Sequence, residues 1–295
     1  MTSPSPGPLP PPVLAEGLSA IAERYDVLLC DVWGVIHNGR EAFPEACRAL
    51  ARFKAERGPV VLISNAPRPN PPVIEQLAGF GVGPEAFSEV VTSGDATRTL
   101  LAERAPGPFW KLGPDRDWPL YEGLGLSFTE LEQARYIACT GPFDDETETP
   151  EDYRERFRAA VAGGLEMICA NPDIVVQRGD RLIYCGGALA QLYEALEGRV
   201  HMAGKPHQAI YDLALAKAAA HLGRPVDRAR VLCIGDGLGT DIRGANAQAL
   251  DVLFIANGIH GKETVRDGRL DASVVEHLLA IEGLAAAWAM ADLVW

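Results

Sequence analysis

The sequence is short of positive charge. Its 27 lysines and arginines stand against 40 aspartates and glutamates, which leaves a formal net charge of −13 at pH 7. Nucleic acids and anionic membrane surfaces are bound through basic faces. We therefore expect no nucleic acid and no membrane as a partner, and an anionic small molecule would need a local positive site.

Cysteine pairs and long apolar runs are lacking too. The six cysteines include no C-x-x-C pair and no histidine spacing that suits zinc, so buried, reduced thiols are expected. The longest apolar run, near 284–295, is shorter than the ~20 residues that span a bilayer and predicts a C-terminal helix packed on the core. The Pro- and Ser-rich start lacks the features of a signal peptide. It predicts a flexible lead-in at 1–14 and a cytoplasmic protein.

Short β-rich runs alternate with helical patterns along much of the chain. Three runs end abruptly in small or polar residues, as buried parallel strands do: 27–30, 60–63 and 231–234. Further strands are expected at 90–92 and 252–256, and helices at 45–56, 72–79 and 206–222. This alternation predicts an α/β protein with an open, doubly wound parallel sheet. Ligands of such sheets bind beyond the carboxyl ends of the strands, where Asp31, Ser64, Asn65 and Asp236 would converge.

The middle of the chain has α/β content of its own. After the linker-like Ala105-Pro106-Gly107-Pro108, strands are expected at 109–112, 135–140, 166–170 and 181–184, and helices at 150–162 and 188–196. We therefore predict a core formed by 15–105 and 203–295, with 106–202 inserted as a second α/β domain.

Three aspartates carry the strongest chemical signal. An apolar strand delivers Asp31 into a turn that contains Gly34, where its carboxylate can act as a nucleophile or a metal ligand, although a turn cap is an alternative use. Asp236 and Asp241 stand five positions apart across a glycine-rich loop. Hard cations such as Mg²⁺ prefer oxygen ligands of this kind. A helix N-cap would explain either aspartate alone, but it explains the pair poorly.

Phosphate-binding groups are expected from two other segments. Lys205, in Gly204-Lys205-Pro206, precedes a proline suited to the first position of a helix and could neutralise phosphate, although most lysines are simply solvated. Ser64 and Asn65 offer a hydroxyl and backbone N–H groups to phosphate oxygens. A turn would use the same two residues.

The order of nucleophile, hydroxyl, lysine and acidic pair resembles the haloacid dehalogenase (HAD) superfamily. It is similar, more narrowly, to the branch with an α/β cap of type IIA inserted between the second and third motifs, which includes many sugar and nucleotide phosphatases. The resemblance covers 25–258. Cap-related segments agree with it: Thr92-Ser93-Gly94-Asp95-Ala96-Thr97, Asn171-Pro172-Asp173 and Gly186-Gly187-Ala188-Leu189.

The resemblance implies a Rossmann-like core, a cap and a reaction. Asp31 would attack phosphorus to form an aspartyl phosphate that water hydrolyses, while Ser64, Asn65 and Lys205 hold the phosphoryl oxygens. Mg²⁺ would be bound by Asp31, Asp236, Asp241 and the backbone carbonyl of Trp33. The implied ligand is a phosphorylated small molecule, contacted from the cap by Asn171 and Asp173, and caps of this type allow a homodimer.

Trp33 departs from the family pattern, which has a second aspartate there to protonate the leaving group. An indole cannot shuttle that proton, and positioned acid–base catalysis is typically worth ~10²–10⁴-fold. One interpretation is a hydrolase that is slow or restricted to good leaving groups, or that takes its proton from His37 or His260. A second is carbon–phosphorus cleavage with Lys111 as a Schiff-base lysine. A third is a catalytically weak protein that binds a phosphometabolite and acts through a partner.

Overall fold

The computed structural model describes residues 10–178, 181–266 and 269–295, which form two compact units. The first unit contains the chain up to Ile63 together with Glu75–Val90 and Ala214–Trp295, and the second contains Ser64–Ile74 and Val91–Leu213. The predicted insert at 106–202 falls wholly within the second unit, which also takes in flanking segments. Boundaries at 105 and 203 stay a prediction.

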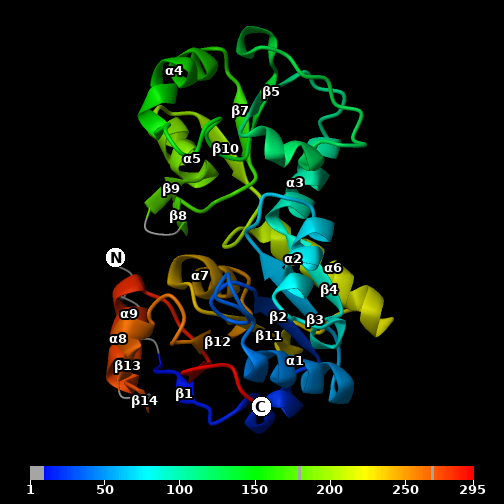
Figure 1. The fold of residues 1–295 in the computed structure, drawn as a ribbon, viewed down its shortest axis with the longest axis vertical. Coiled ribbons are helices and arrows are strands. Elements are labelled where there is room, and N and C mark those ends of the chain that lie inside the picture. Colours follow the sequence, from blue (N-terminus) through cyan, green and yellow to red (C-terminus); the bar gives the residue numbers. More distant parts are fainter. Residues whose placement is uncertain (1–9, 179–180, 267–268) are drawn as a thin grey trace, which may run out of the picture. The chain divides into compact units, whose positions relative to one another are not determined.

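The larger sheet is mostly parallel and has the strand order β1-β15-β12-β11-β2-β3-β4 (Figure 1). Its strands are β1 (Val13–Leu14), β2 (Val27–Asp31), β3 (Val60–Ser64), β4 (Glu89–Thr92), β11 (Val231–Gly235), β12 (Asp251–Ile255) and β15 (Trp288–Met290). Strand β2 is buried throughout and lies between β11 and β3. Its unbroken apolar run, which ends at Asp31, is typical of a central strand whose two faces are both covered.

Helices accompany this sheet: α1 (Pro44–Glu56), α2 (Asn70–Gly79), α6 (Gln208–Leu222), α7 (Arg243–Ala247), α8 (Gly261–Thr264) and α9 (Ala272–Glu282). In α1, Pro44 occupies the first turn, and Ala46, Ala49, Leu50 and Phe53 are buried. Their spacing of three and four residues gives the helix one apolar face. The predicted doubly wound α/β architecture is confirmed.

Both ends of the chain differ from the sequence-based expectation. The run near 284–295 forms no terminal helix, because Trp288–Met290 pairs in parallel with β12 as β15. Val13 and Leu14, placed in the flexible lead-in of 1–14, form β1 and pair in turn with β15; residues 1–9 lie outside the described part. A short apolar run suits a buried strand as well as a helix. Here it forms a strand because it can pair with β12.

The second unit has a parallel sheet of its own, with the order β10-β7-β6-β5. Its strands are β5 (Phe109–Leu112), β6 (Tyr136–Cys139), β7 (Glu166–Cys169) and β10 (Arg199–Met202), and β8 (Val175–Arg178) and β9 (Arg181–Tyr184) form a separate hairpin. Helices α3 (Ser93–Ala102), α4 (Arg154–Ala162) and α5 (Gly186–Ala195) belong to this unit. Thr92 and Asp95 start α3 with a reciprocal capping box.

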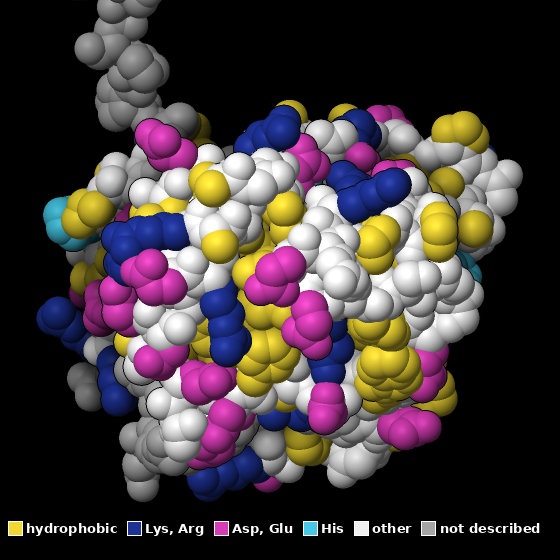
Figure 2. Space-filling view, turned by 90° about the horizontal axis from the view of Figure 1, so that it is seen from above, with side chains coloured by type: hydrophobic (Ala, Val, Ile, Leu, Met, Phe, Trp, Pro, Cys, Tyr) yellow, Lys and Arg dark blue, Asp and Glu magenta, His cyan; other side chains and the backbone are white. Residues whose placement is uncertain are grey.

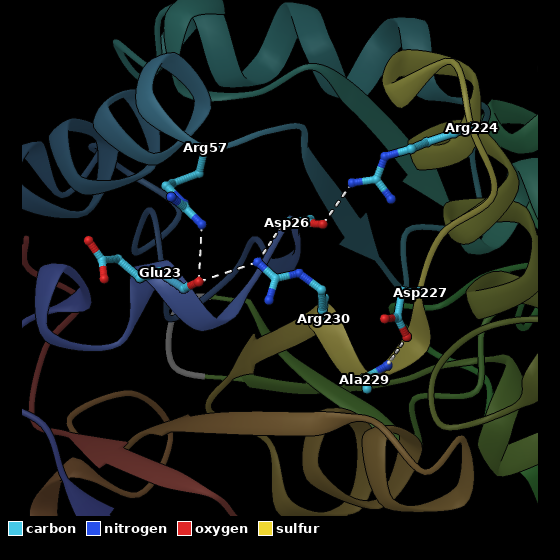
Figure 3. Close-up of polar contacts among 7 residues, drawn as sticks. All are labelled: Glu23, Asp26, Arg57, Arg224, Asp227, Ala229 and Arg230. Carbon is cyan, nitrogen blue, oxygen red and sulfur yellow. Dashed lines mark hydrogen bonds and ion pairs between the residues drawn. The ribbon is translucent and has the colours of Figure 1, made fainter.

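A network of arginines fastens the amino-terminal ends of β2 and β11 (Figure 3). The Asp26 carboxylate accepts hydrogen bonds from Arg230 and Arg224, each at 2.7 Å. Arg57 and Arg230 also donate to the backbone oxygen of Glu23, at 3.0 and 3.3 Å. Hydrogen bonding from Arg230 is the largest influence on Asp26 and lowers its pKa to about 2.

The surface and the thiols agree with the composition. None of the six cysteines is in a disulfide, and five of them are buried while Cys47 is partly exposed. Among the described residues, no helix has both the length and the apolar character needed to cross a membrane. On the face shown in Figure 2, basic and acidic side chains are interspersed around apolar ones and form no continuous basic area.

Candidate active site

Three carboxylates meet at the carboxyl ends of two neighbouring strands in the first unit. Asp31 ends β2, Asp236 follows β11, and Asp241 lies in the helical turn η8 (Leu238–Ile242). All three are buried, with 7%, 6% and 3% of their surface exposed, and each offers an oxygen within 4.8 Å of the others. The structure thus brings together the three aspartates that the family resemblance assigns to the metal, and their role as ligands stays a prediction.

Two glycines make room for the Asp236 carboxylate. Gly34 has a φ of +83°, and a Cβ there would lie 2.1 Å from Asp236 Oδ2. A Cβ at Gly258 would lie equally close, at 2.1 Å. The next residue, Ile259, donates its backbone N–H to the same oxygen at 2.7 Å. The segment after β12 therefore helps to hold Asp236, which sequence analysis missed because Gly258-Ile259 carries no motif of its own.

Asp241 is oriented by its own loop. Its Oδ2 accepts a hydrogen bond from the backbone N–H of Gly237 at 3.1 Å and from the Thr240 hydroxyl at 3.3 Å. Its backbone N–H donates to the Gly237 carbonyl at 2.9 Å. These bonds close the turn and turn the carboxylate back toward the strand end.

The residues present fit a hard divalent cation. Three carboxylates in one buried place would repel one another when ionised, and burial away from water increases the cost. A bound Mg²⁺ offsets this repulsion and takes oxygen ligands of this kind. The acidic cluster is therefore a suitable metal centre on its chemistry and burial, while the Trp33 carbonyl stays a predicted fourth ligand.

Trp33 is an exposed side chain on an ordered loop. The indole is 58% exposed and makes an edge contact with the His37 ring, whose centroid is 5.2 Å away. His37 is buried, its Nδ1 accepts from the backbone N–H of Gly39 at 2.9 Å, and burial lowers its pKa to about 4. A neutral ring held in this way suits a packing role beneath Trp33 better than the proton-donor role considered from sequence.

The other two side chains considered as sources of chemistry come from the segment after β12 and from the second unit. His260 precedes α8, and burial lowers its pKa. Lys111, on β5 of the second unit, forms an ion pair with Asp115 at 2.6 Å. This contact engages the lysine amine, which does not favour the Schiff-base chemistry of the second interpretation.

The second unit gathers another group of predicted residues around Asn65. The Asn65 side chain accepts from the backbone N–H of Lys205 at 2.8 Å and donates to the Lys205 carbonyl at 3.2 Å. It also donates to the Asp173 carboxylate at 3.0 Å. Asn171 in turn accepts from the backbone N–H of Asp173 at 3.1 Å. Asn65 thus acts as a clamp on the Lys205 backbone, a role that no sequence motif indicates.

Lys205 and Ser64 complete this group. Lys205 is only 3% exposed, and a charge so buried requires compensation by partners. Ser64 ends β3, and its hydroxyl accepts from the backbone N–H of Ala66 at 3.3 Å. Ile63, which precedes Ser64, pairs with Asp31 in the sheet. The phosphate-binding roles of Ser64, Asn65 and Lys205 remain predictions.

Comparisons with known proteins define the family. Residues 28–127 match the model of a haloacid dehalogenase-like hydrolase, and 202–281 match a second, HAD-hydrolase-like model. A crystal structure of a haloacid dehalogenase-like hydrolase from Brucella suis 1330 is 43% identical, with a TM-score of 0.82, covering 95% of this chain and all of that one. The chain belongs to the haloacid dehalogenase-like hydrolases.

Curated relatives carry phosphatase names. The D-glycerol 3-phosphate phosphatase of Mycobacterium tuberculosis is 29% identical over 82% of this chain and 66% of its own length, so the chain spans just under two thirds of that protein. The 5'-nucleotidase YutF of Bacillus subtilis is 24% identical over 83% of this chain and 92% of its own. The chain is thus similar to phosphatases of the class IIA branch.

Proposed function

We propose that the protein is a Mg²⁺-dependent phosphatase of a small organic phosphate, with Asp31 as the nucleophile. The observation that carries this proposal is the buried cluster of Asp31, Asp236 and Asp241, with Asp31 at the end of the central strand β2. The phosphatase names of the relatives support a phosphorylated metabolite, such as a sugar or nucleotide phosphate, as the substrate.

The reaction follows from the residue types. A carboxylate oxygen of Asp31 forms a bond to phosphorus while the bond from phosphorus to the leaving oxygen breaks, which gives an aspartyl phosphate. Attack of water then releases phosphate and restores the carboxylate. Lys205, Ser64 and Asn65 would hold the phosphoryl oxygens, and Asn171 and Asp173 would contact the organic part. Mg²⁺, held by Asp31, Asp236, Asp241 and the Trp33 carbonyl, would supply charge neutralisation for the anionic substrate.

Trp33 restricts the leaving group. Since its indole has no transferable acidic proton, the leaving oxygen departs with little assistance from this position. We infer that substrates whose leaving groups are weak bases react fastest, and that simple alkyl phosphates react slowly.

A rate assay with a matched pair of variants tests the proposal. Phosphate release from a panel of sugar, nucleotide, aryl and acyl phosphates is measured with Mg²⁺ or with EDTA. Asp31→Asn should abolish release, while Asp212→Asn, on the exposed side of α6, should leave it unchanged. Turnover that survives in Asp31→Asn refutes the nucleophile. If no compound turns over but the native chain and Asp31→Asn bind a phosphate ester equally well, the protein is a binder.

Location and assembly are further parts of the proposal. We propose a cytoplasmic protein, because its six cysteines form no disulfide and are mostly buried, and a homodimer as the form to test. Light scattering during size-exclusion chromatography measures the mass directly, and a species near the 31.7 kDa of one chain would refute the dimer.

A further inference from the structure

Two residues with large, exposed apolar side chains lie in the loops whose backbone adjoins Asp236 in the first unit. Ile259 is 75% exposed and Trp33 is 58% exposed. Gly34, the residue after Trp33, lies against Asp236 Oδ2. The backbone N–H of Ile259 donates a hydrogen bond to the same oxygen. Two loops distant in sequence thus each carry an exposed apolar residue on backbone that adjoins the acidic centre.

The Trp33 ring is supported from one side. A Cβ at Gly39, where φ is +83°, would lie 2.1 Å from Cη2 of the indole, so only glycine lets the ring lie against this backbone. The His37 ring meets the indole edge at an interplanar angle of 79°. Phe80 supports His37 in turn, with the centroids 4.9 Å apart. The indole is therefore positioned on its loop, and more than half of its surface is available to a ligand.

We propose that Trp33 and Ile259 form an apolar rim that binds the leaving group and makes the enzyme selective for phosphate monoesters of aromatic hydroxyls. The proposal rests on the phosphatase function proposed above and names its substrate class. Aromatic rings attract one another in stacked or edge-to-face arrangements and bury a large apolar area, which an indole and an isoleucine offer and a carboxylate does not.

The chemistry of an aryl ester matches the missing acid. When Asp31 bonds to phosphorus, the electron pair of the breaking P–O bond stays on the aryl oxygen, and a phenolate leaves. The phenolate is far less basic than an alkoxide, since phenols such as tyrosine have a pKa of about 10, and water can protonate it after departure. Compared with the aspartate of the family pattern, Trp33 thus lacks the proton donor and offers an apolar surface to an aryl leaving group. Of the leaving groups considered, a phenolate needs proton donation least.

Three substrates separate aromatic contact from leaving-group basicity. Phenyl phosphate has an aromatic leaving group, acetyl phosphate has a good leaving group without a ring, and glycerol 3-phosphate has neither property. Steady-state kcat/KM is measured for native protein, Trp33→Leu, Trp33→Phe and Ile259→Ser. Ile281→Ser is the matched control, because Ile281 on α9 is 66% exposed and has no part in the rim.

Trp33→Leu should lower kcat/KM for phenyl phosphate about tenfold, with a change of about twofold or less for acetyl phosphate. Trp33→Phe should retain most of the aryl preference, Ile259→Ser should lose part of it, and Ile281→Ser should match the native chain. An equal loss on phenyl and acetyl phosphate, or no loss on either, overturns the rim.

Other outcomes show that the proposed phosphatase function, with Asp31 as the nucleophile, has failed. If Asp31→Asn remains active, the assignment of the nucleophile fails, and if no phosphate ester is hydrolysed, the phosphatase assignment fails, whatever the selectivity. The rim can then still be tested by calorimetry, which measures the affinity of the native chain and of Trp33→Leu for phenyl phosphate. Equal affinity of the two proteins for phenyl phosphate would overturn it.

Discussion

Replacing Trp33 by aspartate would place a carboxylic acid two residues after the proposed nucleophile, where it could protonate a departing oxygen. A positioned acid contributes typically ~10²–10⁴-fold, and an unoptimised one should reach the lower end of that range. We expect Trp33→Asp to raise kcat/KM for glycerol 3-phosphate about 10²-fold. The structure tolerates the change, since the indole is 58% exposed and its loss removes one edge contact with His37.

The assay compares a series of substituted phenyl phosphates with alkyl phosphates. In the native protein log kcat/KM should fall steeply as the leaving-group pKa rises, and in Trp33→Asp the slope should be shallow because the acid assists the poorer leaving groups. Trp33→Asn is the control, because its amide has a similar size but no transferable proton. If Trp33→Asp is no faster than Trp33→Asn on glycerol 3-phosphate, the missing acid does not limit the native enzyme.

Three other predictions follow from the contacts described above. Asp236→Asn should abolish activity and also remove the rise in melting temperature on adding Mg²⁺, because one of three buried oxygen ligands loses its charge; an unchanged Mg²⁺-dependent rise would refute the metal centre. Asn65→Ala should lower the free energy of unfolding in urea by about 1–3 kcal/mol, since it leaves backbone groups of Lys205 without their side-chain partner. A loss below about 0.3 kcal/mol would contradict the role of Asn65 as a clamp on the Lys205 backbone. The folded-state pKa of Asp26 is lowered to about 2, so its stabilisation is present above the unfolded value of 3.8 and is lost as pH falls toward 2. Asp26→Asn should therefore cost about 1 kcal/mol at pH 7, after allowance for solvent screening, and almost nothing at pH 2; an equal cost at both pH values would contradict the linkage.

Local sequence patterns predicted most of the architecture. The runs at 27–30, 60–63 and 231–234 form strands β2, β3 and β11, because their apolar residues suit a buried position with both faces covered. The two short strands at one side of the sheet, β1 at its edge and β15 beside it, escaped prediction. Each is only two or three residues long, and it is a strand because a neighbour's edge is available, which is a property of the tertiary structure.

The candidate site also has a part that could be predicted from the sequence and a part that could not. Asp31 and Asp236 could be predicted because each directly follows an apolar strand, and the carboxyl ends of parallel strands meet at one edge. The support given to Asp236 by Gly258 and Ile259 could not be predicted, because it depends on where β12 lies beside β11. A residue's presence at a strand end is local information, whereas its hydrogen-bond partner is set by strand order.

Asn65 shows why this distinction matters for experiments. The family resemblance implies a phosphate-binding residue, yet the Asn65 side chain bonds to the backbone of Lys205, 140 positions away, and to Asp173. A loss of activity in Asn65→Ala would therefore not by itself indicate phosphate contact, because the variant also releases the segment that carries the buried lysine. Lys205→Met separates the two effects, since it removes the charge and keeps the backbone bonds. If phosphate affinity falls in Lys205→Met as much as in the double variant Asn65→Ala/Lys205→Met, Asn65 acts by positioning the lysine.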